Sequence, residues 1–239
     1  MDTIILYEDD ALIVVHKPQN LATQTARVGQ IDVVSELKNY RRNQGEEPYI
    51  GVVHRLDQPV EGLLVFAKTP QVAAMLTSQL QSGKLQKGYV AFVDGIVNAG
   101  DCARLTDYLV KDVRTNFSRV VDSDTRGAKK AGLMYKGLQV CMIEALSEKF
   151  SIVEIELFTG RHHQIRVQFS HAGMPLLGDN KYATEHTRKL SEQLGIKSTA
   201  LLAHRLHFCH PLEGRELKFS IEYTQAEFCR GSLAVTVLT

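Results

Sequence analysis

The chain has 239 residues, 44% of them apolar, and a formal net charge of +1 from 28 basic and 27 acidic side chains. This length allows one large hydrophobic core or two small ones. Its longest apolar runs are too short to span a bilayer, and no basic segment leads into an apolar one near the start, so we expect neither membrane insertion nor a secretion signal. Four scattered cysteines without C-x-x-C spacing indicate reduced thiols in a cytoplasm.

Positive charge is concentrated in two places despite the near-neutral total. Residues 111–130 carry six basic and three acidic side chains, and Lys38, Arg41 and Arg42 form a second cluster. Because nucleic-acid binding depends on where charge lies rather than on its sum, the composition neither requires nor excludes such a partner. Taken alone, either cluster is more simply interpreted as solvated surface charge.

The first third of the chain predicts alternating strands and helices. Apolar runs on both sides of the acidic turn at residues 8–10 indicate two short strands. Residues 31–42 indicate a helix whose basic end is C-terminal, as the helix dipole prefers. Residues 63–68 indicate a buried strand, and residues 69–83 a helix with a Thr-Pro start and a glycine stop.

The remaining chain adds strands and one short helix. Residues 87–95, 150–160 and 217–221 indicate strands, and residues 161–173 indicate a helix that ends at a glycine. Residues 99–134 are polar and contain glycine, and we expect them to be the most mobile part.

Strands outnumber helices in this pattern, and hairpins connect them plausibly. We therefore expect an α+β fold with a mixed or largely antiparallel sheet, flanked by helices and loops. No repeat, low-complexity tract or linker marks a boundary, so we expect a single domain over residues 1–239.

Asp57 lies just before the predicted buried strand 63–68, where the cost of burying a carboxylate requires a partner. Arg166 is a candidate partner, because it lies in a helix that begins directly after the Thr159-Gly160 turn, a common place for functional side chains. An aspartate paired with arginine stays ionised, which suits a nucleophile or a base. A structural buried salt bridge explains the same facts equally well.

The histidines suggest a metal site that we consider improbable. His204, His207 and His210 repeat every third residue, a spacing that neither a strand nor a helix gathers on one face, and no H-E-x-x-H motif occurs. Phosphate-binding glycine loops and a G-x-S-x-G motif are also missing from the sequence. Tyr89, taken alone, is an ordinary half-buried strand aromatic. We expect no metal and no nucleotide cofactor.

The segment HRLDQPVEGLLVFAK, residues 54–68, resembles the H-R-L-D-x-x-[ST]-x-G-L-L-[VL]-x-A-K signature of the RluA-type pseudouridine synthases. Four further segments resemble blocks of that family in the same order, namely ILYEDDALIVVHKPQNL, KGYVAFVDG, FTGRHHQIRVQFSHAGMPLLGDNKY and LLAHRLHFCHPLEGRELKF. The five blocks extend from residue 4 to about residue 219. Their ordered agreement is far more specific than any single block.

The resemblance implies an enzyme that converts uridine in RNA to pseudouridine. It breaks the N1 glycosidic bond, turns the bound uracil and joins C5 to the ribose C1′, which consumes nothing and needs no cofactor. By position, Asp57 is the essential aspartate, Tyr89 the aromatic stacked on the target base and Arg166 the partner of the carboxylate. Arg55 fills the gap left by the flipped uridine, whose extrusion costs a few kcal/mol.

Further RNA contacts are expected inside these blocks and in the basic stretch. We assign them to His54, Arg161, His163, Lys129 and Lys130. Many family members carry an N-terminal S4 RNA-binding domain, and the first block begins too early here to leave room for one, so we expect the catalytic domain itself to bind RNA, as a monomer. The target, ribosomal or transfer RNA, is left open.

The chain departs from the family pattern at three positions near the signature residues. Val60 replaces a small hydroxyl residue, Glu61 adds a carboxylate that we expect to face solvent, and His162 stands where threonine or serine is usual. Asp57 attacks C1′, adds to C6 or removes the C2′ proton, and the sequence does not choose among these routes. A non-catalytic RNA-binding protein that retains the fold is the alternative function.

Overall fold

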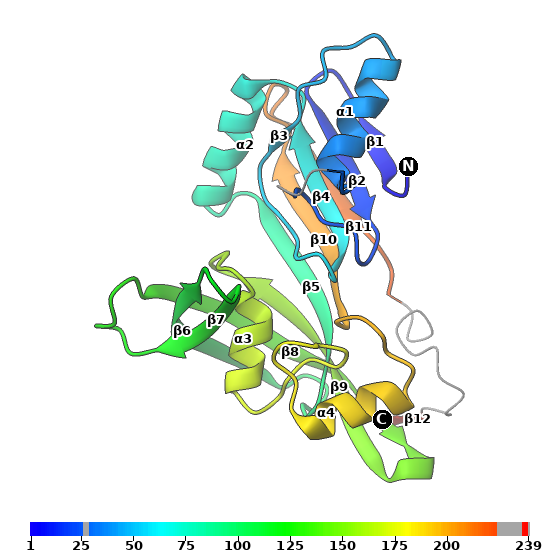
Figure 1. Cartoon of the computed structure of the whole chain (residues 1–239), viewed down its shortest axis with the longest axis vertical. Coiled ribbons are helices and arrows are strands. Elements are labelled where there is room, and N and C mark those ends of the chain that lie inside the picture. The colour runs from blue at the N-terminus through cyan, green and yellow to red at the C-terminus, as the bar shows by residue number, and fades with distance from the viewer. Residues whose placement is uncertain (26–28, 224–235, 239) are drawn as a thin grey trace. The chain divides into compact units, whose positions relative to one another are not determined.

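Strands and helices form where the hydrophobic pattern places them. The computed structural model describes residues 1–25, 29–223 and 236–238. The chain divides into a first unit, residues 1–87 and 202–222, and a second unit, residues 88–201 and 223–239. The elements of both units are labelled in Figure 1.

The first unit is built on a mostly antiparallel sheet. Its strands are, in spatial order, β1 (Ile4–Glu8), β2 (Leu12–Lys17), β4 (Glu61–Ala67), β10 (Leu201–Cys209) and β11 (Glu216–Ser220), and the short β3 (Gly51–Val52) pairs with β4. β10 runs parallel to β4, and the other pairs are antiparallel. β4 and β10 approach closely at Gly62, where φ is +132° and a Cβ would lie 2.4 Å from the Ala203 carbonyl oxygen. Only glycine fits there.

Two capped helices complete the first unit. α1 (Val33–Asn43) begins at Asp32, whose side chain accepts from the Ser35 amide. α2 (Pro70–Gln81) begins at Thr69, whose hydroxyl accepts from the Val72 amide. Val72 and Leu76 of α2 are buried in one apolar cluster with residues of β2, β4 and β10. This core supports β4, which forms the second half of the signature segment.

The second unit is an antiparallel sheet with α3 on one face. Its strands are, in spatial order, β5 (Gln86–Val93, from Gly88 onward), β9 (Glu148–Leu157), β8 (Lys129–Ile143), β6 (Cys102–Asp112) and β7 (Phe117–Val121), and β12 (Thr236–Leu238) pairs with β8. A 3-10 turn (Glu144–Leu146) joins β8 to β9. α3 (Gln164–His171) packs Val167 against Leu109 and Ala131. α4 (Glu185–Gln193) follows α3 in the chain.

The fold class predicted from the sequence is confirmed, as are the predicted strands and helices. The stretch at residues 99–134 contains β6, β7 and the start of β8, so it has regular structure; its mobility stays a prediction. Its polar composition fits this arrangement, because Leu109 and Ala131 are buried against Val167 of α3 while most residues of β6 and β7 are exposed or half-buried. The sequence pattern missed β3, β10, α4 and β12, as well as the strands β6, β7 and β8 in and after this stretch. A single domain over the whole chain also stays a prediction.

Candidate active site

The turn that carries Asp57 is held by the loop after β2. The Leu56 amide donates to the Thr23 hydroxyl oxygen at 3.1 Å, and that hydroxyl donates to the Leu56 carbonyl at 2.9 Å. On the other side, the Gln58 side-chain amide donates to the Asn20 carbonyl at 3.0 Å. The backbone is thus fixed both before and after Asp57, which is itself half-buried.

Lys17 binds the same turn from within the fold. Its side chain is completely buried, and its ammonium donates to the carbonyls of Pro18 (2.9 Å), Leu21 (2.7 Å) and Gln58 (3.2 Å). Burial lowers the pKa of Lys17 to about 8, and the negative charges of Glu61 and Asp57 oppose that shift. A positive charge therefore lies within electrostatic range of both carboxylates.

Glu61 does not simply face solvent, which corrects our expectation. Its Oε1 lies 2.7 Å from His16 Nε2, and the two side chains are 30% and 22% exposed. The β2–β4 register places His16 opposite Leu63, which makes Glu61 its diagonal neighbour two residues away. The extra carboxylate of this chain is therefore bound to the neighbouring strand.

The other polar residues of the signature differ in exposure. Arg55 is exposed, whereas His54 is only 7% exposed and its Nε2 accepts from the Val65 amide at 3.4 Å. Arg55 is thus free to extend toward a ligand in solution. His54 is fixed inside the fold. RNA can contact it, as we predicted, only by approaching a side of the ring that is buried in this structure.

Arg166 is buried in α3 of the second unit and binds Asp179. Its Nε and Nη2 each lie 2.7 Å from a carboxylate oxygen of Asp179, and both side chains are at most 3% exposed. The guanidinium carbon also lies 5.3 Å from the centre of the Tyr182 ring. Sequence reasoning missed Asp179, although it belongs to the quoted GDNKY segment. Asp57 lies in the first unit, so its predicted pairing with Arg166 stays a prediction.

A polar and aromatic cluster surrounds the start of α3. His162 and His163 stack with ring centres 3.7 Å apart. The Ser118 hydroxyl oxygen lies 2.8 Å from His162 Nδ1, and the Ser118 amide donates to the Tyr182 hydroxyl at 2.8 Å. His163 Nδ1 lies 2.7 Å from the same Tyr182 hydroxyl. The unusual His162 therefore holds β7 against the residues that precede α3.

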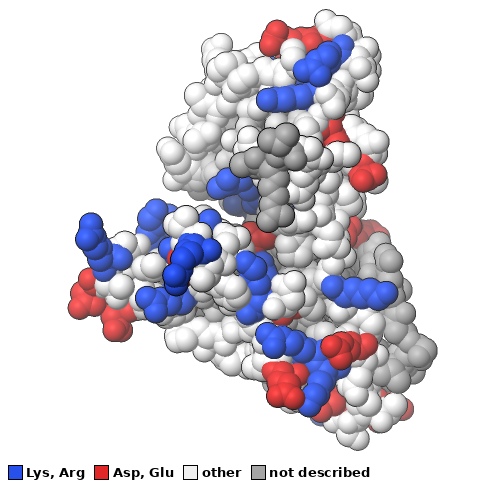
Figure 2. All heavy atoms as spheres, in the orientation of Figure 1, with Lys and Arg blue, Asp and Glu red and all other residues white. Residues whose placement is uncertain are grey.

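Basic side chains gather over β6 and β7 in the second unit (Figure 2). The six basic side chains of residues 111–130 are all exposed, including Lys129 and Lys130. Arg161 is exposed as well, and its Nε donates to the Lys130 carbonyl at 3.0 Å. Tyr89 is only 4% exposed and lies opposite Ile155 in the β5–β9 pair.

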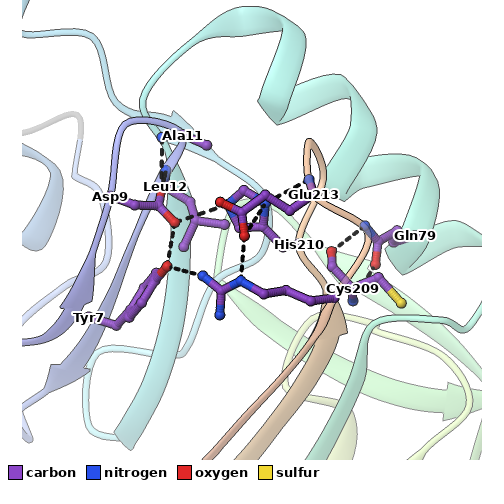
Figure 3. A network of polar contacts seen from close by, with 9 residues as sticks. Tyr7, Asp9, Ala11, Leu12, Gln79, Cys209, His210 and Glu213 are labelled. Carbon is purple, nitrogen blue, oxygen red and sulfur yellow. Dashed lines mark hydrogen bonds and ion pairs between the residues drawn. The ribbon is translucent and has the colours of Figure 1, made fainter.

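His210, the last of the three histidines spaced every third residue, follows β10 and forms contacts inside the first unit. His210 Nε2 lies 2.9 Å from Asp9 Oδ2, and the Glu213 amide donates to His210 Nδ1 at 3.0 Å (Figure 3). The Tyr7 hydroxyl donates to the same Asp9 oxygen at 2.6 Å. Within residues 1–25, 29–223 and 236–238, no three His, Cys, Asp or Glu side chains are grouped as metal ligands. No described helix is long and apolar enough to cross a membrane.

Comparisons with known proteins agree on one family. A family model described as RNA pseudouridylate synthase matches residues 11–171. The tRNA pseudouridine synthase C of Haemophilus ducreyi is 30% identical over 220 residues, which span 88% of this chain and 87% of the relative. The ribosomal large subunit pseudouridine synthase C of Pasteurella multocida is 31% identical over 216 residues, 90% of this chain and 63% of the relative.

Two solved structures share the fold. Human RNA Pseudouridylate Synthase Domain Containing 1 has a TM-score of 0.76 at 18% identity and covers 99% of this chain and 90% of its own. Human RNA Pseudouridylate Synthase Domain Containing 4 has a TM-score of 0.71 at 21% identity, with 95% and 93% covered.

The buried Arg166–Asp179 pair predicts a large stability effect. Asp179→Asn keeps the shape of the side chain but leaves the Arg166 charge short of its partner, so we expect the free energy of unfolding to fall by about 3 kcal/mol. Glu185→Gln is the matched control, because it breaks the exposed Glu185–Lys189 pair and should cost no more than about 0.5 kcal/mol. Urea denaturation of both variants measures the difference. Equal losses would show that burial of the first pair has no energetic consequence.

Proposed function

Because the chain belongs to the RNA pseudouridylate synthase family, whose model matches residues 11–171, we propose that Asp57 is the carboxylate with which it isomerises uridine in RNA. The chain is an isomerase that acts on RNA. The observation that carries the assignment of Asp57 is the turn held at Leu56 and Gln58, which fixes one carboxylate of an intact HRLD motif while leaving it half-buried.

Isomerisation breaks the bond between N1 and C1′ and forms one between C5 and C1′. The proton on C5 is lost and N1 gains one, so atoms and charge balance without an oxidant, a metal or a nucleotide. Asp57 takes part by attack at C1′, by addition at C6 or by removal of the C2′ proton. Each route begins from an ionised carboxylate, and the buried ammonium of Lys17 lies within electrostatic range of Asp57.

The target base must leave its stack before Asp57 reaches the glycosidic bond. We assign the space vacated in the RNA to Arg55, which is exposed, and the stacking contact with the flipped uracil to Tyr89. Arg166 orients the Asp57 carboxylate, as the family pattern implies. The Arg166–Asp179 pair supports this role, because a guanidinium fixed at two of its nitrogens is oriented before substrate binds.

The basic side chains on β6, β7 and the start of β8 supply phosphate contacts. Lys129 and Lys130 are exposed at the start of β8, and Arg161 is hydrogen-bonded to the Lys130 carbonyl, which brings a third cation to the same place. His163 helps to hold β7, which carries another part of this basic surface, through the Tyr182 hydroxyl. We further propose that the protein acts as a monomer in the cytoplasm, without an obligate protein partner.

Transfer RNA is the first substrate class to test. The tRNA enzyme of Haemophilus ducreyi aligns over 87% of its own length, whereas the ribosomal RNA enzyme of Pasteurella multocida aligns over 63%. The shared length favours transfer RNA, and large-subunit ribosomal RNA is the second candidate.

Asp57→Asn should abolish turnover and preserve RNA binding, because it removes the ionised carboxylate and keeps its shape. We expect tritium release from 5-tritiated uridine in RNA to fall at least about 10⁴-fold. Filter binding of the same RNA should give an unchanged Kd. Normal turnover by this variant would refute the assignment, and a purely RNA-binding function predicts no release by the parent protein.

Deletion of the gene should remove one or a few pseudouridines from transfer RNA. Mapping of pseudouridine across total RNA, with and without a plasmid copy of the gene, identifies the sites. A loss confined to ribosomal RNA would reassign the substrate class while leaving the chemistry intact. Retention of every pseudouridine would contradict both.

Replacing Lys129 and Lys130 together by alanine should weaken RNA binding and its salt dependence. Each lost phosphate contact lowers the slope of log K against log salt by about 0.7–0.9. Lys189→Ala is the control, because this exposed lysine is paired with Glu185 on α4. Titrations at several salt concentrations measure the slopes. An unchanged slope in the double variant would show that both lysines are ordinary surface charges and do not contact phosphates.

A further inference from the structure

Lys87, at the start of β5 in the first unit, is a half-buried cation that lacks an acceptor. Across the described parts of the chain its ammonium takes part in no hydrogen bond and no ion pair. Burial lowers its pKa to about 8, and no neighbouring carboxylate opposes that shift. Lys17 differs from Lys87 in this respect. Its pKa is also lowered to about 8, but its ammonium has three carbonyl acceptors and is within electrostatic range of two carboxylates.

His54 provides a second donor beside Lys87 that also lacks an acceptor. Its Nε2 accepts the Val65 amide proton, so the neutral ring carries its own proton on Nδ1. That Nδ1 is buried and has no partner among the described residues. Burial, followed by the positive charge of Lys87, holds the pKa of His54 well below its usual value. Lys87 therefore lies within electrostatic range of a neutral N–H donor.

A buried donor without an acceptor, such as His54 Nδ1, is costly, and such groups occur where a ligand or water satisfies them. The ligand chemistry that fits a cation and a neutral N–H is an anionic oxygen. His54 lies three residues before Asp57 in the turn assigned to catalysis, and RNA brings a phosphate with every nucleotide. A lysine ammonium is a common phosphate ligand.

We propose that Lys87 binds a phosphate of the substrate RNA, with the neutral His54 N–H as a second donor to that site. This inference rests on the proposed function, since it assumes that RNA reaches the turn that carries Asp57. Lys87 is then a binding residue that is retained for the ligand at a cost in stability.

The proposal has a definite pH dependence. A bound phosphate raises the pKa of Lys87, so binding takes up a proton at and above pH 8, and affinity falls as pH rises through that range. Other titratable groups lie in the same region. His54 stays neutral, Lys17 also titrates near pH 8, and His207 on β10 lies 3.4 Å from Gln86 and 3.7 Å from Glu216. All three are present in every variant below, so a comparison isolates Lys87.

The test compares Lys87→Met and Lys87→Arg with Lys84→Met, an exposed lysine three residues earlier. The probes are the transfer RNA fraction and the large-subunit ribosomal RNA of cells that lack the gene. Between pH 7 and pH 9 we expect the Kd of the parent protein to rise about fivefold to tenfold. Lys87→Met should bind about tenfold more weakly at pH 7 and lose most of this dependence. Lys87→Arg should bind tightly at both values, and Lys84→Met should behave like the parent.

Thermal unfolding supplies an independent readout. Lys87→Met removes a half-buried, partly desolvated cation without an internal partner, so its melting temperature should rise while its RNA affinity falls. An affinity and pH dependence equal to the parent's, or a lowered melting temperature, would overturn the proposal. Turnover by the parent protein, measured by tritium release in the same preparations, separates the two claims. If the parent protein shows no turnover on either RNA fraction, the proposed function is contradicted. If the parent turns over normally and Lys87→Met has no effect on RNA binding, only the phosphate site is contradicted.

Discussion

The candidate active site depends on the hydrogen bonds that the buried ammonium of Lys17 donates. Three carbonyls accept from it, two from the loop after β2 and one from the turn that carries Asp57. An ammonium buried without acceptors is unfavourable, so the loop and the turn keep their places together around it. One side chain thereby fixes the end of β2, the loop after it and the turn that carries Asp57, and adds a positive charge near the carboxylate.

The second unit uses an ion pair in the same way. Arg166 and Asp179 satisfy each other in the interior, so the guanidinium plane is fixed before any ligand arrives. The contacts of Ser118 and Tyr182 then fix β7 near the start of α3. Charged and polar groups inside both units hold loops in place, while the apolar cores hold the sheets. This division of labour lets the segments of the candidate active site be irregular in backbone and still held in place.

Local features of the fold were predictable because their causes are local. The cap at Thr69 and the alternation along β9 are written in neighbouring residues. The Glu61–His16 pair was not predictable, because it depends on the register of β2 against β4. The burial of Lys17 was missed for a similar reason, since its acceptors are backbone carbonyls, which a sequence does not display. The prediction for Asp57 rests on an ordered set of motifs and stays a prediction, whereas its surroundings required the fold.

The first unit is discontinuous in sequence, which has a consequence for its synthesis. β4 forms the second half of the signature segment, yet its parallel neighbour β10 begins only at Leu201, after most of the second unit has been made. At 5–20 residues per second, a ribosome needs roughly 7 to 30 s to pass from Asp57 to that strand. The close fit of Gly62 against Ala203 and the bond between Asp9 and His210 must both wait for it. A nascent chain therefore carries the signature segment for several seconds or more before the sheet of the first unit is complete.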